Sequence, residues 1–298
     1  MNTKRRLLII GAGDVAQRVA RQLAGRYRLF ALVRQAESAS VWRALGATPI
    51  IGDLDTADSL RRLAGVADIV LHCAPPPANG DADPRTRRLL AALGRGQSLP
   101  CSLVYISTTG VYGDCHGASI NETRQTRPTT PRACRRVAAE KALRAFGVRC
   151  GVRVAILRAP GIYASDRLPI ERLRRADPVL RQSEDVFTNH IHADDLASAA
   201  TLAITRAAPG RVYNAVDHSD MPMGDFYDLL ADSFSLPRPP RMSRFECAAR
   251  LGAATLSFMG ESRRIANTRL VRELGVRLRY PTVGDGIRAA VDARSKSQ

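Results

Sequence analysis

The sequence predicts an α/β protein built on a Rossmann-type doubly wound parallel sheet, with a smaller, mostly helical C-terminal substrate lobe. Three observations lead to this prediction. Up to about residue 160, short apolar runs alternate with helical patterns, as in a parallel sheet that helices cover on both faces. The first run ends in a glycine loop that opens a helix. After Tyr163 the alternation gives way to a polar, arginine-rich segment.

Six apolar runs mark the strands of the predicted sheet. The first is residues 7–13 and the last is residues 152–163, and helical stretches such as 59–64 and 85–93 lie between runs. Short aliphatic runs bounded by glycine or proline are typical of buried strands. The intervening runs are residues 29–34, 47–54, 67–74 and 102–107.

The later part of the chain adds a strand to the first domain and supplies the second lobe. Residues 187–192 predict a short strand that leads into a helix, and residues 210–216 predict another strand. We therefore expect residues 1–163, completed by about 187–217, to form the nucleotide-binding domain. Residues 164–186 and 218–298 are then the smaller substrate-binding lobe.

The composition restricts the partners. No apolar run approaches the roughly 20 residues of a membrane span, so no membrane association is predicted. The net charge of +17 can indicate a nucleic-acid partner. The arginines are spread along the whole chain, however, and no nucleic-acid-binding motif appears, so nucleic acid is not favoured. A small-molecule substrate that bears phosphate suits the charge equally well.

The cysteines and histidines give no metal-binding pattern. The six cysteines are scattered without a CxxC motif, and the five histidines are dispersed; His190 and His192 share a face of a predicted strand but have no ligand partners at a suitable spacing. No metal site is predicted. Free thiols indicate a reducing, cytoplasmic location.

The glycine loop has the pattern GxGxxA. Gly11 permits the tight turn, Gly13 lets the backbone approach a pyrophosphate, and Ala16 allows the helix to pack near the strand. The loop follows an apolar strand and opens an amphipathic helix, which is the context that supports dinucleotide binding. The helix N-terminus offers unpaired N–H groups to the phosphates.

The end of the second strand indicates which dinucleotide is bound. An acidic residue there would bond the ribose 2′-hydroxyl of NAD, whereas this sequence has Arg34, which suits the 2′-phosphate of NADP. Glu37 follows and is interpreted as a surface residue. NADP is therefore the preferred cofactor, and NAD remains an alternative.

One lysine stands apart in an arginine-rich sequence. The chain has only three lysines, and Lys141 alone lies away from the termini. It falls on a predicted helix for which Thr130 is the expected N-cap and Pro131 the first residue. An ammonium group can reach a pair of ribose hydroxyls, a task that the planar guanidinium of arginine performs poorly.

Taken together, these motifs resemble those of the NAD-dependent epimerase/dehydratase family, the extended and atypical short-chain dehydrogenase/reductases. GAGDVA resembles the family's cofactor loop, and SLVYISTTGVYGD resembles its fifth strand with the VYG signature. The resemblance covers nearly the whole chain. Its other segments are GDL (52–54), HCAPP (72–76), RAPGIYA (158–164), HIHADDLA (190–197), VYNAVD (212–217) and residues 262–275.

The resemblance implies catalytic positions. In the family a tyrosine acts as acid or base, a lysine four residues later holds the nicotinamide ribose, and a Ser or Thr of the fifth strand bonds the substrate oxygen. Mapped onto this sequence, the lysine is Lys141 and the hydroxyl residue is Thr108. The loop and the resemblance together predict these cofactor-binding residues: Gly11, Gly13, Asp14, Val15, Ala16, Arg34, Asp53, Leu54, Ala74, Pro75, Ser107, Lys141, Pro160 and Ile162.

The tyrosine position of this mapping is Val137, and valine cannot transfer a proton. Tyr112 of the VYG signature is a candidate replacement, and Tyr163, Cys134 and His116 are further ones. Atypical family members keep the cofactor fold without the tyrosine, and some of them act as sensors or scaffolds.

Three functions therefore stay open. The first is an NAD(P)-dependent epimerase, dehydratase or reductase, for which the resemblance implies a nucleotide-sugar or another carbonyl or hydroxyl substrate and a homodimer as one arrangement. In this enzyme Arg263 and Arg264 are candidates to grip a phosphate. The second is a non-catalytic NADP-binding regulatory or redox-sensing protein. The third is nucleic-acid binding through the +17 charge.

Overall fold

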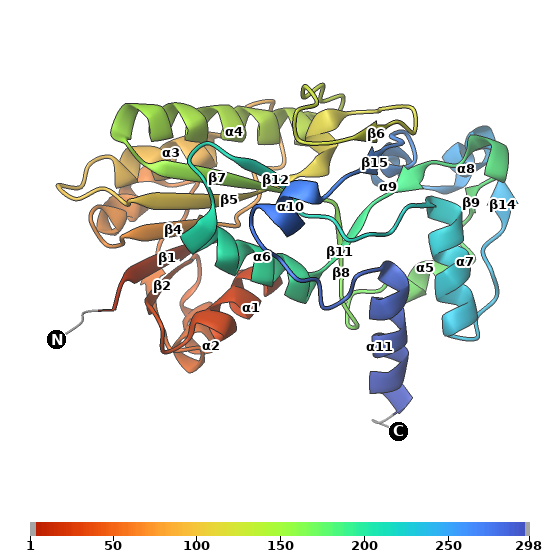
Figure 1. Ribbon diagram of the computed structural model, residues 1–298, viewed down its shortest axis with the longest axis horizontal. Helices are drawn as coiled ribbons and strands as arrows, with labels where there is room; N and C mark the ends of the chain where they lie inside the picture. The colour runs from red at the N-terminus through yellow and green to blue at the C-terminus, as the bar shows by residue number, and fades with distance from the viewer. Residues whose placement is uncertain (1–3, 296–298) are drawn as a thin grey trace.

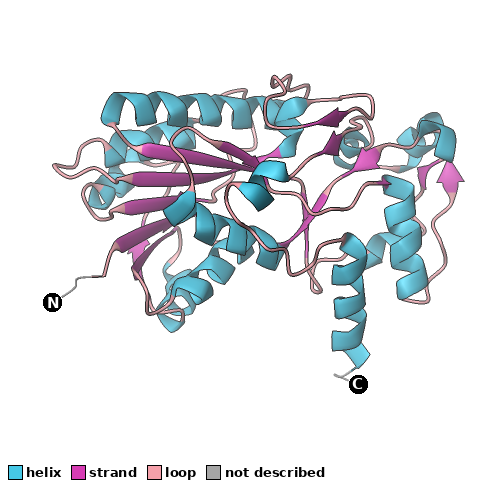
Figure 2. Cartoon of the chain, viewed as in Figure 1, coloured by secondary structure: helices cyan, strands magenta, loops and turns pink. Residues whose placement is uncertain are grey.

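The computed structural model describes residues 4–295, and its centre is a parallel sheet of seven strands in the order β12-β7-β5-β4-β1-β2-β3 (Figure 1). Helices lie on both sides of this sheet (Figure 2). The predicted Rossmann-type fold is confirmed. The strands are β1 (Arg6–Ile10), β2 (Arg28–Val33), β3 (Ala47–Ile51), β4 (Ile69–His72), β5 (Ser102–Thr108), β7 (Arg153–Ala159) and β12 (Val212–Asn214).

The strand order reverses between β1 and β4, and this reversal places the site. β1 pairs in parallel with β2 on one side and with β4 on the other. The helical connections after β1 and β4 therefore leave the sheet in opposite directions, and a crevice opens at the carboxyl ends of the two strands. Ligands of doubly wound sheets bind in this crevice.

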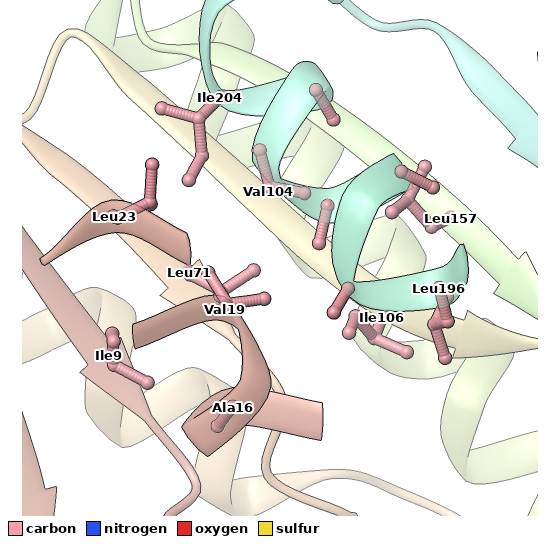
Figure 3. Packing of buried hydrophobic residues seen from close by; sticks show 14 of the residues in the cluster. Ile9, Ala16, Val19, Leu23, Leu71, Val104, Ile106, Leu157, Leu196 and Ile204 are labelled. Carbon is pink, nitrogen blue, oxygen red and sulfur yellow. The ribbon is translucent and has the colours of Figure 1, made fainter. Parts of the chain in front are cut away.

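The two faces of the sheet have separate apolar cores. On one face, α1 (Asp14–Leu23), α2 (Ala39–Ala44) and α6 (Ala193–Arg206) pack against the strands. Figure 3 shows Val19 and Leu23 on α1 and Leu196 and Ile204 on α6, over the strands of this face, and the two helices pack against each other. On the other face lie α3 (Pro84–Leu93) and α4 (Pro131–Cys150).

α4 carries several residues of the site. As predicted, Thr130 is its N-cap, because the side chain of Thr130 accepts a hydrogen bond from the amide of Ala133, and Pro131 is its first residue. The helix ends at Gly151, which adopts the left-handed conformation with φ of 65°. Its buried side chains fix which face is turned toward the sheet.

The remaining elements lie beyond the carboxyl ends of the strands. A separate core there packs α5 (Ile170–Arg174), α7 (Met223–Ser233) and α11 (Val283–Ser295) together. Figure 1 shows this helical part at the opposite end of the molecule from β2. The short elements are β6 (Ser119–Ile120), β8 (Gly161–Tyr163), β9 (Val179–Leu180), β10 (Phe187–Thr188), β11 (His190–His192), β13 (Met221–Pro222), β14 (Arg241–Met242), β15 (Arg264–Ile265), α8 (Arg244–Arg250), α9 (Ala253–Phe258), α10 (Thr268–Arg272) and the 3-10 turns η1 (Ala36–Ser38), η2 (Ala57–Leu63), η3 (Thr109–Tyr112) and η4 (Gln182–Glu184).

The segment expected as a helix at residues 59–64 is the 3-10 helix η2. The hydroxyl of Ser59 bonds the backbone of Asp53 and Thr56 there, and such local bonds compete with an α-helical ladder. Within residues 4–295, none of the helices combines the length and the apolar character that a bilayer crossing requires.

Candidate functional site

A first cavity of about 500 Å³ lies at the carboxyl ends of β1, β2 and β4. The glycine loop after β1 forms one wall, and the loops after β2, β3 and β4 form the others. The predicted cofactor-binding residues that line this cavity are Gly11, Gly13, Asp14, Val15, Ala16, Arg34, Asp53, Leu54, Ala74 and Pro75.

The glycine loop fits a bound pyrophosphate. Gly11 has φ of +93°, and a Cβ atom there would lie 2.4 Å from the backbone nitrogen of Ala74. Gly13 faces open space, because a Cβ atom added there would meet no atom within 4 Å beyond its chain neighbours. Gly13 is also the N-cap of α1 and gives no side-chain hydrogen bond to the first turn, so the first amides of the helix are free to bind phosphate oxygens.

Asp14 in the first turn of α1 is neutralised by two arginines. Its carboxylate pairs with Arg18 at 2.9 Å and with Arg167 at 3.0 Å. Partial burial acts to raise the pKa of Asp14, but the two guanidinium groups lower it overall. The negative charge of Asp14 is therefore offset before an anionic cofactor arrives.

Two of the arginines that line the first cavity lie near one carboxylate. Arg34 follows β2 and Arg85 is on α3, and the charges of both help to lower the pKa of Asp55. Arg85 also pairs with Asp55 at 2.5 Å and donates to the carbonyl oxygen of Pro75. These two guanidinium groups are suited to a phosphate group of a ligand in this cavity.

A second cavity, of about 550 Å³, adjoins the first, because Arg167 lines both. Thr108 at the end of β5 lies in its wall, as do Pro160, which follows β7, and Ile162 of β8. These three predicted residues therefore face the second cavity rather than the first. Ser107 lies in neither wall: it is buried, and its hydroxyl donates to Glu140 at 2.7 Å.

The second cavity is lined by five arginines and one acidic residue, Glu261. Aromatic rings from β8, β10, β11, α7 and α9 also line this cavity. Apart from Arg263, sequence reasoning did not identify these arginines. The five are Arg132, Arg136, Arg167, Arg172 and Arg263.

Lys141, expected beside the nicotinamide ribose, is instead exposed and lines neither cavity. The reason is the phase of α4. Arg132 and Arg136, one turn apart, face the second cavity. Lys141 follows Arg136 by five residues, a rotation that leaves it about 140° away around the helix.

Val137, expected at the tyrosine position, does not face the second cavity either. It is half-buried and packs with Val111 and Tyr112 in a small apolar cluster. Tyr112 is buried, and its hydroxyl donates to Asn214 at 2.7 Å. The guanidinium of Arg158 covers its ring at 4.7 Å. The structure thus gives Tyr112 partners in the core and does not bring it to either cavity.

Of the other candidate proton donors, Tyr163 lies in the wall of the second cavity. Its hydroxyl donates to the carbonyl oxygen of Thr282 at 3.3 Å, and burial raises its pKa strongly. Cys134 is half-buried with its sulfur against the Pro128 carbonyl, and His116 is exposed beside Asp114.

His190 also lines the second cavity. The sequence predicted only that His190 lies on one face of a strand, and this did not indicate a role in the site. Its side chain is buried, its ring stacks on Phe226 with 4.5 Å between centroids, and its Nδ1 has no hydrogen-bond partner among the described residues. Burial lowers its pKa to about 4, so the ring is neutral near pH 7. It can accept or donate one hydrogen bond to a ligand.

A buried ion pair joins three elements behind Thr108. Glu140 of α4 receives hydrogen bonds from Arg158 of β7 at 3.1 and 2.7 Å and from Ser107 of β5. Burial acts to raise the pKa of Glu140, but Arg158 and the Ser107 hydrogen bond hold it below its ordinary value. This carboxylate fixes α4 against β5 and thereby places Arg136 relative to Thr108.

The fold and the first cavity define a Rossmann-type α/β protein with a crevice at the switch point of its sheet. Residues 7–215 match the family model "NAD dependent epimerase/dehydratase family", and the chain belongs to this family. The resemblance inferred from the sequence motifs is thereby confirmed.

The chain is also similar in sequence to known proteins. An uncharacterised protein of Schizosaccharomyces pombe, C2A9.02, is 28% identical over 250 residues, 78% of this chain and 81% of its own. A mouse dTDP-D-glucose 4,6-dehydratase is 25% identical over 126 residues, 40% of this chain and 36% of its own.

Solved structures extend the likeness over the whole chain. A functionally unknown protein from Silicibacter pomeroyi has a TM-score of 0.79 and 28% identity, covering 98% of this chain and 99% of that one. A UDP-glucose 4-epimerase from Thermotoga maritima, solved with UDP-glucose, also has a TM-score of 0.79 with the same coverage. At 16% identity the latter shows the shared fold alone. A dTDP-glucose 4,6-dehydratase from Streptomyces venezuelae with bound NAD has a TM-score of 0.78 and 20% identity, covering 98% of this chain and 97% of that one.

Proposed function

We propose that this protein is an NAD(P)-dependent oxidoreductase that acts on a carbonyl or hydroxyl group of a small, negatively charged substrate. The observation that carries the proposal is the meeting of the two cavities at Arg167. One cavity is built on the dinucleotide loop, and the other places Thr108 among arginines. The related structures include a UDP-glucose epimerase and a dTDP-glucose dehydratase, so a nucleotide-linked sugar is one substrate class to test.

NADP is the proposed cofactor, with NAD as the alternative that the NAD-bound dehydratase structure from Streptomyces venezuelae supports. Arg34 follows β2, where an acidic residue would bond the ribose hydroxyl of NAD. Arg85 lies in the same wall. Both guanidinium groups suit the additional 2′-phosphate.

The residues around Thr108 suit the reduction of a carbonyl. When bound, the nicotinamide supplies or accepts a hydride. The Thr108 hydroxyl can donate a hydrogen bond to the substrate oxygen, and the Arg132 and Arg136 guanidinium groups can stabilise the negative charge that this oxygen gains when the carbon receives the hydride. Arginine stays protonated and neither removes nor supplies a proton, so the proton that completes the hydroxyl comes from solvent water. We therefore propose that the site reduces a carbonyl, with the arginines as electrostatic groups and water as the proton source.

The test is a direct one. Purified protein is titrated with NADPH and with NADH by calorimetry, and NADPH consumption is then followed at 340 nm with nucleotide sugars and small oxo compounds. The proposal expects tighter binding of NADPH and turnover of at least one negatively charged compound. Tight binding without turnover of any compound would instead favour the non-catalytic, cofactor-sensing alternative.

A cytoplasmic location and a homodimer are further parts of this proposal. None of the six cysteines forms a disulfide within residues 4–295, in keeping with a reducing compartment. Light scattering on the eluting protein checks the second part, since a homodimer has twice the 32.4 kDa mass of the chain.

A further inference from the structure

Two arginines on one face of α4 point toward the second cavity. Arg132 and Arg136 are separated by one helical turn, so their side chains project from the same face. Both line the second cavity together with Thr108. We refer to Arg132 and Arg136 as the arginine pair.

Arg136 is held in place and leaves donors free. Its Nη1 donates to the Tyr105 hydroxyl at 2.8 Å and to the Ile106 carbonyl oxygen at 3.0 Å. Since Ile106 is two residues before Thr108 on β5, the guanidinium lies at the carboxyl end of that strand. No hydrogen bond of its Nε or Nη2 is found within the described part of the chain.

Arg136 also lies close to the first cavity. Its charge acts to lower the pKa of His72 and of Cys73, although burial is the larger influence on both. Cys73 is part of the wall of the first cavity. A group bound by Arg136 therefore lies near the border between the two cavities, where the reacting parts of cofactor and substrate would meet.

Arg132 lies against an aromatic ring rather than a carboxylate. Its guanidinium lies over the Phe258 ring at 4.4 Å. Loss of hydration lowers its pKa, Glu261 opposes this, and Arg136 and Arg263 lower it further. Glu261 is already paired with Arg263 at 2.6 Å.

The arginine pair therefore carries two charges without a counterion. Within residues 4–295, no carboxylate lies within ion-pair distance of either Arg132 or Arg136. The other three arginines of the second cavity each have an acidic partner: Asp14 for Arg167, Asp177 for Arg172 and Glu261 for Arg263. Two adjacent uncompensated guanidinium groups repel each other, and a bound anion removes this cost.

We propose that the arginine pair binds a carboxylate of the substrate next to the carbon that reacts, so that the substrate is a short oxo acid or its hydroxy acid. The planar fork of each guanidinium matches a carboxylate in a bidentate way. Arg136 of α4 donates to the carbonyl oxygen of Ile106, two residues before Thr108 on β5, so a carboxylate bound by Arg136 lies close to the carbonyl that Thr108 bonds. The substrate class rests on the proposed function, whereas anion binding by the pair does not.

The test first measures binding without any turnover. Oxalate and inorganic phosphate are titrated calorimetrically into the wild-type protein and into Arg132→Gln, Arg136→Lys and Arg149→Gln. Arg149 is an exposed arginine of the same helix that lines neither cavity. The proposal expects oxalate to bind the wild-type protein and Arg149→Gln equally, and to bind Arg132→Gln roughly 10- to 100-fold more weakly. Arg136→Lys keeps the charge but loses the fork, so an intermediate loss is expected.

The second arm tests the substrate class with NADPH present. Rates are compared for 2-oxobutanoate, for the neutral ketone 2-butanone and for dihydroxyacetone phosphate. A preference for the oxo acid that disappears in Arg132→Gln supports the proposal. Absence of oxalate binding, equal binding by Arg132→Gln, or tighter binding of phosphate than of oxalate at the pair would overturn it. If NADPH does not bind at all, the proposed function fails, while the oxalate titration still decides whether the pair binds a carboxylate.

Discussion

The buried carboxylate of Glu140 offers the sharpest test of how the site is held together. Its side chain is 1% exposed and its main partner, the Arg158 side chain, is 4% exposed. Replacing Glu140 by leucine removes the counterion and leaves a buried guanidinium whose Nη1 already lacks a partner among the described residues. Breaking such a pair from one side costs about 3–5 kcal/mol of unfolding free energy.

Two comparison variants separate the buried charge from simple loss of contact. Glu140→Leu combined with Arg158→Met removes both charges, and it should recover most of the lost stability because no uncompensated charge remains. Arg144→Gln removes the other arginine that pairs with Glu140, at 3.1 Å and 37% exposed, and should cost under about 1 kcal/mol.

Urea unfolding followed by the fluorescence of Trp42, which is buried and the only tryptophan, measures all three variants. The folded-state pKa of Glu140 is lowered, so its contribution to stability is full above the ordinary carboxyl pKa and fades as the pH falls below it. The gap between wild type and Glu140→Leu should therefore narrow under acidic conditions. A Glu140→Leu variant no less stable than Arg144→Gln at pH 7 would refute the reasoning.

The remaining predictions concern the two cavities and the core. Gly11→Ala should weaken NADPH binding strongly and lower the free energy of unfolding by about 1–3 kcal/mol, because its Cβ would lie 2.4 Å from the backbone nitrogen of Ala74. The control is Gly25→Ala, where φ is +78° but a Cβ would meet open space. It should lower the free energy of unfolding in urea by less and leave NADPH binding intact. Arg34→Gln should weaken NADPH binding roughly 10-fold and leave NADH unchanged in calorimetry, and an equal loss for both would argue against a 2′-phosphate contact. Burial raises the pKa of Asp217 to about 7, so its ionisation opposes folding increasingly as the pH rises from about 4 to 7; Asp217→Asn should be about 1–4 kcal/mol more stable than wild type at pH 8 and equal to it near pH 4. Lys141→Ala should change neither cofactor affinity nor turnover, and a tenfold loss of either would return Lys141 to the site.

The first cavity could be predicted from the sequence because its walls are local. The glycine loop, Arg34 and the segment at Asp53 each follow directly after a strand that reads as an apolar run. Parallel strands bring their carboxyl ends to one edge of the sheet. Once the strands are located, the residues after them must gather there, and no side-chain orientation has to be known.

The second cavity could not be predicted in the same way. Its wall combines residues from α4, the loop after β7, α7 and the segment around Glu261, which are distant in sequence and lack a shared strand edge. Arg172 contributes through a hydrogen bond to Tyr227 at 2.5 Å. Such a contact depends on how the helical lobe packs, and an arginine-rich chain offers many equivalent residues at the level of sequence.

The prediction for Lys141 rested on how rare lysine is in this chain, whereas the orientation of α4 brings Arg136 to the cavity instead. Lysine is rare in this chain, and rarity suggested a special role, yet orientation on α4 is decided by the residues that the helix buries. Counting 100° per residue from Arg136, Leu143 lies about 20° away and Lys141 about 140° away. Leu143 is fully buried against the sheet, so any residue near its phase faces inward. The helix period alone, read from the buried leucine, thus selects Arg136 over the lone lysine as the residue that faces inward. A guanidinium there supplies a positive charge, but it binds planar anions better than ribose hydroxyls, which is why the oxalate titration decides what this cavity holds.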